Sequence, residues 1–178
     1  MDILAHGLWT NAIFESSARL KNQKRSRRDI WLGILFGIAP DLLSFGIFFV
    51  QNIFRVIFFS EESPFQGGPP DPNLIPDYIS TLYNFTHSFI IFAAVFGLIW
   101  LIRRKPYWLM AGWGIHIIID IFSHSKDFFP TPFLFPVSDF TINGTSWGHS
   151  TFMLINYSAL ILVYAYFFIS RKRNAKKN

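Results

Sequence analysis

Three histidines and two aspartates lie inside apolar segments of the sequence, where ionisable side chains are costly and usually functional. At about 1.5 Å per helical residue from the nearer basic end of each segment, all five lie roughly 14–22 Å along it. Imidazole nitrogens and carboxylate oxygens together suit a divalent cation such as zinc. No Lys or Arg lies at this depth to pair with the carboxylates, so we predict one metal site. Its predicted ligands are His6, Asp41, His87, His116 and Asp120.

The strongest local pattern places His116 and Asp120 four residues apart, which puts both on one face of a helix. Such a pair can clamp one ion between a nitrogen and an oxygen. A structural alternative is a buried His–Asp hydrogen bond that locks two helices together. His124 lies on the same helix face, about 12 Å beyond His116 along the axis. We therefore expect it outside the ligand set unless the helix unwinds after Asp120.

The other candidates stand beside breaks in the helical pattern. Pro40 removes a backbone donor next to Asp41, so that carboxylate can either face a cavity or bond the freed backbone. His87 follows Thr86 at the start of an apolar run and is either a ligand or an interfacial residue. A lone His6 on an amphipathic helix can also be structural. Catalysis would need a general base, and Asp41, His87 and His124 all remain candidates for it.

The segments that must position these side chains are membrane helices. Hydrophobic residues make up 51% of the 178 residues and charged residues 15%, against a usual share of about 25%, which argues against a soluble fold and against disorder. Having no Cys excludes disulfides and thiolate ligands. We expect an all-α membrane bundle in residues 1–170, with an N-terminal amphipathic or membrane-inserted helix over Ile3–Leu20. Its four transmembrane helices are predicted at Trp31–Val50, Phe85–Ile102, Tyr107–Phe122 and Thr151–Ile169.

Thirteen of the 16 Lys and Arg fall in three clusters beside these segments, near residues 21–28, 103–105 and 171–177. Such clusters mark cytoplasmic loops in membrane proteins, and a nucleic-acid-binding face is not expected. The basic tail, residues 171–178, and the C-terminus should then be cytoplasmic. The acidic, Pro-rich residues 61–83 should form an outside loop without a long helix. We expect the Phe-Pro segment at 128–136 to lie in the outer interface or fold over the bundle mouth.

The order of these motifs resembles that of the bacterial and archaeal membrane-bound metal-dependent hydrolase family. The matching elements are His6-Gly7, Pro40-Asp41, Thr86-His87-Ser88, Gly112 to Asp120, and Phe133-Leu134-Phe135-Pro136, and together they cover roughly residues 3–137. That family often has a second Asp and a His after Pro-Asp. This chain has Leu42, Leu43 and Ser44 there, which argues against a second ion.

The resemblance implies a multi-pass protein of the inner membrane that hydrolyses a substrate with the help of a metal ion. A site near the outer leaflet under a Phe-Pro segment would suit a lipid or lipid-linked ester, with membrane lipids as partners. A cation or proton transporter is one alternative, although its ionisable residues would be expected to form a ladder across the bundle. A small membrane scaffold with a structural metal is another. The sequence leaves the oligomeric partner unknown.

Overall fold

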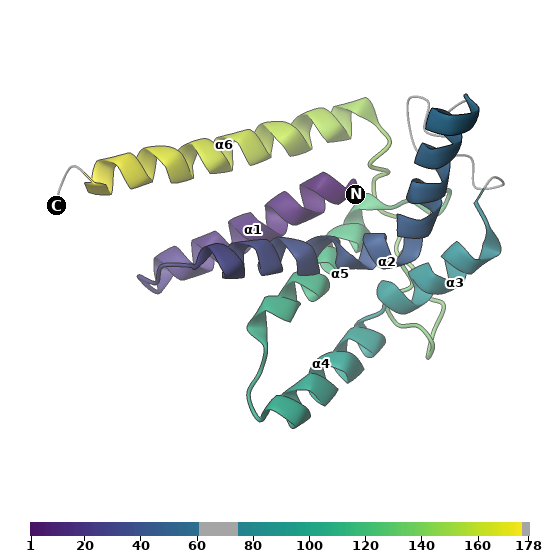
Figure 1. Cartoon of the computed structure of the whole chain (residues 1–178), viewed down its shortest axis with the longest axis horizontal. Helices are drawn as coiled ribbons and strands as arrows, with labels where there is room; N and C mark the ends of the chain where they lie inside the picture. Colours follow the sequence, from purple (N-terminus) through teal and green to yellow (C-terminus); the bar gives the residue numbers. More distant parts are fainter. Residues whose placement is uncertain (61–74, 176–178) are drawn as a thin grey trace.

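The computed structural model in Figure 1 describes residues 1–60 and 75–175, which form helices and loops and contain no strand. This confirms the predicted all-helical class. The helices are α1 (Ile3–Leu20), α2 (Arg27–Phe59), α3 (Asp77–Thr86), α4 (Phe89–Arg103), α5 (Ala111–Ser123) and α6 (Ser150–Ala175), with a short 3-10 turn, η2 (Trp108–Met110), before α5.

Two of these helices, α2 and α6, are long and apolar enough to cross a membrane. The pair α3 and α4 would make a third span, bent by 58° at the break between the two helices. The apolar stretch Trp108–Ser123 is shorter, about 24 Å long against a hydrocarbon core of about 30 Å. The structure therefore supports a helical membrane protein with two or three spans, and the four-span arrangement stays a prediction.

The observed helices differ from the predicted segments at two places. Helix α2 continues to Phe59, well past the predicted end at Val50. Helix α3, of 10 residues, begins at Asp77 and so lies partly within residues 61–83, where a loop without a long helix was expected. Glu61, Glu62 and Asp71 of that predicted loop lie outside the described residues.

Helix α3 forms because its apolar face is buried against α2. Ile79 and Tyr83, four residues apart on that face, are almost completely inaccessible to solvent. Ile79 packs with Phe48 of α2 and with Ile75. This contact joins segments far apart in the sequence, so hydropathy within the segment alone does not reveal it.

Small residues allow α1, α2 and α5 to cross closely. A Cβ atom added to Gly112 of α5 would lie 3.0 Å from the Gly33 carbonyl oxygen and 3.1 Å from the Gly37 nitrogen, both in α2. It would also lie 3.0 Å from Cγ2 of Thr10 in α1. Small residues at such crossings let helix backbones approach in membrane proteins.

This crossing sets the positions of the ionisable residues. His6 lies four residues before Thr10, Asp41 four after Gly37, and His116 four after Gly112. Residues four apart share a helix face, so the side chains one turn beyond the crossing face the same space. The close packing of α1, α2 and α5 therefore explains why these ionisable residues lie in one layer, as their depth along each segment predicted.

Gly112→Leu is expected to separate the three helices and disrupt the polar layer. Overpacking a close contact typically costs about 1–3 kcal/mol of unfolding free energy. Thermal unfolding in detergent should show this loss. Gly97→Leu on α4 is the matched control, because a Cβ atom there meets nothing within 4 Å. Equal melting temperatures for the two variants would contradict the role given to the crossing.

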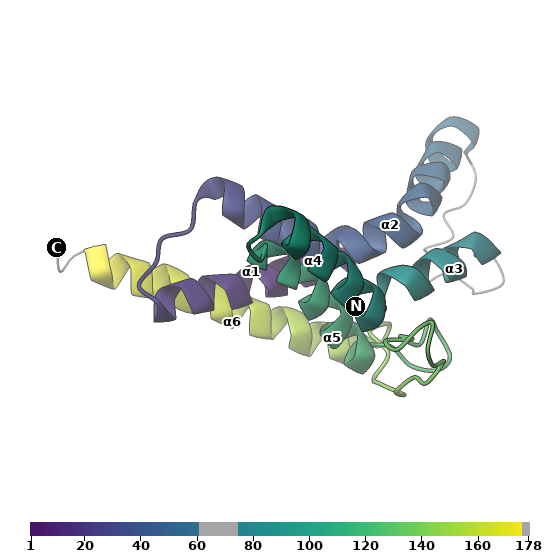
Figure 2. The same cartoon turned by 90° about the horizontal axis from the view of Figure 1, so that it is seen from below.

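Helix α2 changes direction along its length, running beside α1 and then away from it (Figures 1 and 2). It contains Pro40, which lacks a backbone donor and is the residue expected to bend it. Helix α6 lies beside α1 in both views and contacts it. Trp9 donates to the Asn156 side chain at 2.7 Å, and Tyr164 donates to the Leu8 carbonyl at 3.0 Å.

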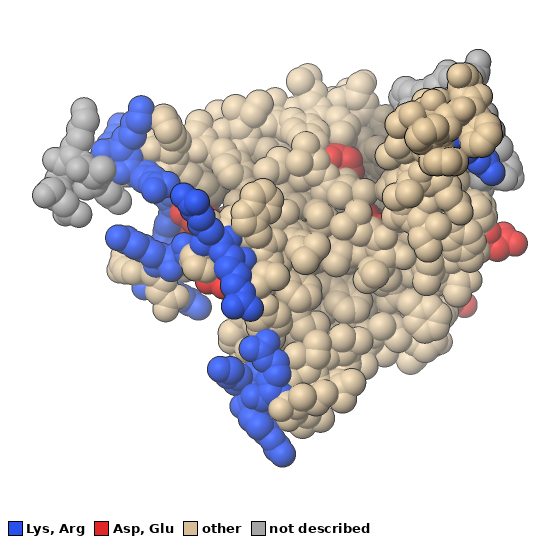
Figure 3. Space-filling view, viewed as in Figure 1, with Lys and Arg blue, Asp and Glu red and all other residues tan. Residues whose placement is uncertain are grey.

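Basic side chains gather at one end of the molecule, where α1 meets α2, α4 meets α5, and α6 ends (Figure 3). The described members of the three predicted clusters, apart from Arg25, are exposed there. Arg25 is partly buried and donates to the Asn11 side chain at 2.8 Å and to the Asp29 carbonyl at 3.0 Å. The gathering of all three clusters at one end is the arrangement that the positive-inside rule predicts.

We expect this basic end to face the cytoplasm. Because the chain has no Cys, single substitutions such as Lys24→Cys, Lys105→Cys and Asp139→Cys can be labelled without background. A membrane-impermeant maleimide applied to intact cells, with an outer membrane permeable to it, should label Asp139→Cys alone. The two lysine positions should react only after the inner membrane is opened. Labelling of Lys105→Cys in intact cells would overturn this orientation.

Candidate metal centre

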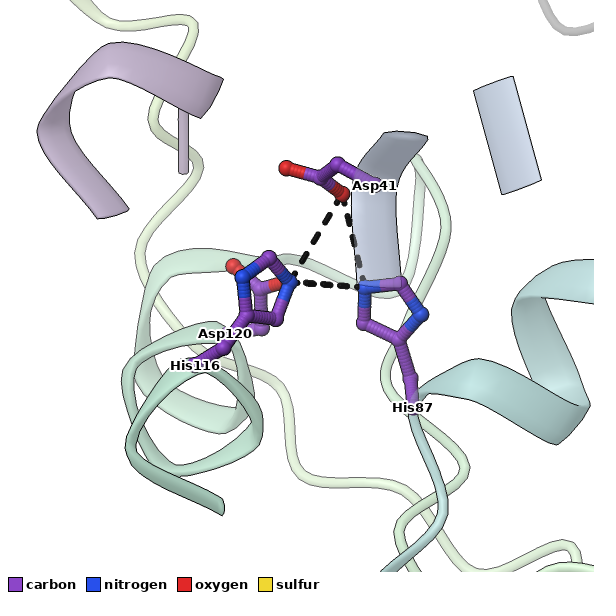
Figure 4. Close-up of side chains that lie close together, drawn as sticks. All are labelled: Asp41, His87, His116 and Asp120. Atoms are coloured by element: carbon purple, nitrogen blue, oxygen red, sulfur yellow. Dashed lines mark hydrogen bonds and ion pairs between the residues drawn. The ribbon is translucent and has the colours of Figure 1, made fainter. Parts of the chain in front are cut away.

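Four buried side chains from three parts of the fold converge on one point (Figure 4). Asp41 comes from α2, His87 from the break between α3 and α4, and His116 and Asp120 from α5. One candidate ligand atom from each lies within 4.8 Å of all the others. The predicted His-x-x-x-Asp pair, the residue after Pro40 and the helix-start histidine are thus brought together.

The distances fit a shared ion. The Nε2 atoms of His87 and His116 are 3.0 Å apart. Asp120 Oδ2 lies 3.2 Å and 3.1 Å from these two nitrogens, and Asp41 Oδ1 lies 3.5 Å and 3.6 Å from them. Ligand atoms that each sit about 2.0–2.2 Å from one ion are themselves roughly 3–4 Å apart.

Polar contacts on the far side of each ring favour a proton on Nδ1; His87 Nδ1 also lies 2.9 Å from the Thr86 hydroxyl. His116 Nδ1 donates to the Gly37 carbonyl at 2.7 Å, and His87 Nδ1 donates to the Tyr83 carbonyl at 3.1 Å. Each Nε2 is then left with a lone pair pointing into the cluster. Backbone carbonyls and carboxylates commonly orient metal-binding histidines in this way.

The cluster therefore brings together two nitrogen lone pairs and two carboxylate oxygens, all buried. Asp120 Oδ2 receives no hydrogen bond from any residue that the structure describes. Within residues 1–60 and 75–175, no Lys or Arg forms an ion pair with Asp41 or Asp120. Electron-rich atoms converging in this way repel one another unless a cation lies among them. Asp41, His87, His116 and Asp120 could hold a metal ion, and two imidazoles with two carboxylates suit zinc or a similar ion.

His6 reaches the same layer but faces a different atom. Its Nε2 lies 2.8 Å from Asp120 Oδ1, the oxygen turned away from His87 and His116. Its ring stacks on that of His116 with centroids 3.7 Å apart, and it is fully buried. The structure thus places His6 beside the four-residue cluster, and direct ligation by His6 stays a prediction.

His124 also approaches Asp120 Oδ1, because α5 ends at Ser123 and the backbone of His124 is extended. Its Nε2 lies 3.3 Å from that oxygen, while Nδ1 donates to the Phe129 carbonyl at 2.9 Å. The helix continues to Ser123, and the His124 N–H still donates to the Asp120 carbonyl at 3.1 Å, so His124 reaches Asp120 from one turn further along α5. The Met1 nitrogen contacts Asp120 Oδ1 and donates to His124 Nε2 at 2.9 Å.

Sequence reasoning missed Tyr83, which supports the cluster from α3. Its ring stacks on His87 with centroids 3.7 Å apart, and its hydroxyl donates to the Phe129 carbonyl at 3.0 Å. Its position four residues before His87 is the one available signal, and it has meaning only once α3 is known to form. The predicted Phe-Pro segment folds over the cluster through this contact and through Ser88, which donates to the Phe135 carbonyl.

His149, Asp127 and Asp139 lie away from the cluster with exposed side chains. These residues supply matched controls for substitutions in the cluster.

The fold and the cluster together define a helical membrane protein with a buried Asp/His site able to bind a metal ion. The sequence model of the YdjM inner membrane protein family matches residues 1–177, and the chain belongs to that family. This supports an inner-membrane protein and leaves the hydrolase activity implied by the resemblance as a proposal. Neither a curated protein nor a solved structure matches the chain.

Proposed function

We propose that this protein is a membrane-embedded, metal-dependent hydrolase that acts on a lipid or lipid-linked ester near the outer leaflet. The observation that carries the proposal is the convergence of lone-pair atoms from Asp41, His87, His116 and Asp120. The resemblance to membrane-bound hydrolases supports the same reading. A divalent ion held by these residues would supply Lewis acidity and activate water for attack on an ester.

His124 is the best placed of the three candidates for general base. Asp41 Oδ1 and His87 Nε2 are two of the four converging ligand atoms. His124 Nε2 lies outside that set, beside Asp120 Oδ1. Nδ1 of His124 is held as a donor by the Phe129 carbonyl, which leaves Nε2 as the acceptor. The Met1 nitrogen donates to this Nε2 at 2.9 Å, so the proposed role as base requires that water replace the Met1 contact.

The proposed step is attack of water on the carbonyl carbon or phosphorus of the ester. The new bond forms from the water oxygen, the water proton passes to His124 Nε2, and the bond to the leaving oxygen breaks. His124 then returns the proton to the leaving alcohol, which balances the reaction.

The position of the site supports a membrane substrate. Asp41 lies about 21 Å along α2 from Arg27 at the basic end, so it is distant from the proposed cytoplasmic face. His124 and Asp41 line the same pocket with Phe45 and Phe128. A substrate that brings its ester to these residues must therefore have an apolar part beside it.

The direct test is hydrolysis of lipid esters and lipid phosphates by purified protein in nanodiscs, with and without added zinc. We expect metal-dependent release of product, abolished by a chelator and restored by the ion. His149→Ala should behave like the unchanged protein, because its side chain is exposed away from the site. Bound metal without turnover on the whole lipid panel would favour the structural-metal scaffold instead.

A further inference from the structure

A pocket of about 270 Å³ lies directly beside the candidate metal centre. Asp41 and His124 contribute to its lining, so the pocket reaches the polar cluster. The rest of its wall is formed mainly by aromatic side chains, among them Phe45, Phe49 and Phe128.

The wall follows α2 outward from the cluster. Phe45 and Phe49 lie one and two helical turns after Asp41, so all three share a face over about 12 Å. The loop after α5 closes the opposite side. Phe129 packs against Phe45 with centroids 5.1 Å apart, and Phe128 approaches Trp147 at 6.5 Å. The polar groups of the wall are Met1, Asp2, Asp41 and His124, and the aromatic part continues along α2 away from the basic end.

The size and chemistry of this pocket select its occupant. A volume of about 270 Å³ is roughly that of nine water-sized groups at about 30 Å³ each, which corresponds to one chain of moderate length. Its described lining contains no Lys or Arg. The Met1 amine, which contacts Asp120 and His124, and the neighbouring Asp2 are ionisable lining groups besides Asp41 and His124. A ligand can therefore place its polar group beside Met1, Asp41 and His124 and its apolar part along the aromatic wall.

We propose that this pocket is the subsite for one unbranched apolar chain of the substrate, whose ester group then lies at Asp41 and His124. This inference rests on the proposed hydrolase function and deepens it by assigning the substrate class and its orientation. Phe49 is the specificity-determining residue, because it lies farthest from Asp41 along the α2 wall. Chains longer than about nine carbons extend past it into the bilayer.

The test uses n-alkyl phosphonates carrying a terminal photoreactive diazirine, with chains of four and nine carbons, on the zinc-loaded protein in nanodiscs. Phosphonates are not hydrolysed, so labelling is read by mass spectrometry without turnover. We expect the nine-carbon probe to label the peptides containing Phe45, Phe49 or Phe128. Phe49→Trp should lower this labelling roughly tenfold by displacing one or two methylene groups, each of which contributes about fourfold in affinity. The four-carbon probe should be unaffected.

Phe58→Trp is the matched control, because Phe58 lies on the same helix with its side chain exposed. It should leave labelling by both probes unchanged. Equal effects of the two Trp variants, or labelling spread evenly over exposed α2 residues, would overturn the subsite. The two proposals fail separately, because pocket labelling without any lipid hydrolysis would contradict the activity and support the chain site. Hydrolysis without pocket labelling would support the activity and contradict the chain site.

Discussion

Purified protein reconstituted with zinc is expected to hold one ion per chain, and Asp120→Asn is expected to lower the affinity by more than about 100-fold. Substitutions behind the direct ligands of metal sites commonly cost about 10–100-fold, and Asp120 is itself a predicted ligand. Its Oδ2 atom lies within 3.2 Å of two imidazole nitrogens and has no hydrogen-bond donor among the described residues. The amide of Asn keeps the shape of the side chain but removes its charge.

Elemental analysis and calorimetric titration with zinc measure this effect. Asp139→Asn makes the same chemical change on an exposed side chain and should leave both readouts unchanged. A comparison of melting curves in zinc-free buffer separates lost binding from misfolding. If the unchanged protein takes up no zinc or other divalent ion after reconstitution, the cluster is a hydrogen-bonded lock between helices, the structural alternative that the sequence left open.

Substitution of His124 should separate catalysis from metal binding. We expect His124→Gln to retain the ion and to lower the rate of lipid-ester hydrolysis by about 10²–10⁴-fold, the usual contribution of a general base. The reason is geometric, because His124 Nε2 lies beside Asp120 Oδ1 and outside the set of four converging ligand atoms. The glutamine side chain can still bond the Phe129 carbonyl but cannot accept a proton near neutral pH.

The rate per bound ion is the quantity to compare, and His149→Gln is the matched control on an exposed histidine. Loss of the ion in His124→Gln would make His124 a ligand. An unchanged rate would return the role of base to Asp41 or His87, the other two candidates from the sequence.

Much of the candidate site could be predicted because it depends on local features. The identity of the ionisable residues, their interruption of apolar runs and their depth along each helix are all properties of one segment at a time. The helical period of His116 and Asp120 placed both on one face, and their Nε2 and Oδ2 atoms are 3.1 Å apart. The first helix was predicted with the bounds that α1 has, because Asp2 caps it and the amphipathic pattern continues to Leu20.

The positions of the two histidines near Asp120 Oδ1, His6 and His124, could not be predicted from single segments of the sequence. Depth placed His6 at the metal, yet it faces the carboxylate oxygen turned away from the other ligands. His124 was expected outside the ligand set, and its Nε2 is not among the four converging atoms, but it lies 3.3 Å from Asp120 Oδ1. The end of a short helix depends on which partners satisfy its last carbonyls, and here the Phe122 and Ser123 carbonyls accept from Thr145 and Trp147 of a distant loop.

By itself, the sequence determined the helical class, the apolar segments, the basic end and the five residues of the polar layer, because hydropathy, charge and helical period act over short stretches of chain. Only the tertiary structure decided that α3 forms, that Asp120 turns its two oxygens toward different histidines, and that carbonyls of Gly37 and Tyr83 favour a proton on Nδ1 of each imidazole. It also placed Phe45 and Phe128 around one pocket beside the cluster. These features depend on contacts between segments far apart in the chain, set by close backbone approach at Gly112 and by burial of Ile79 and Tyr83.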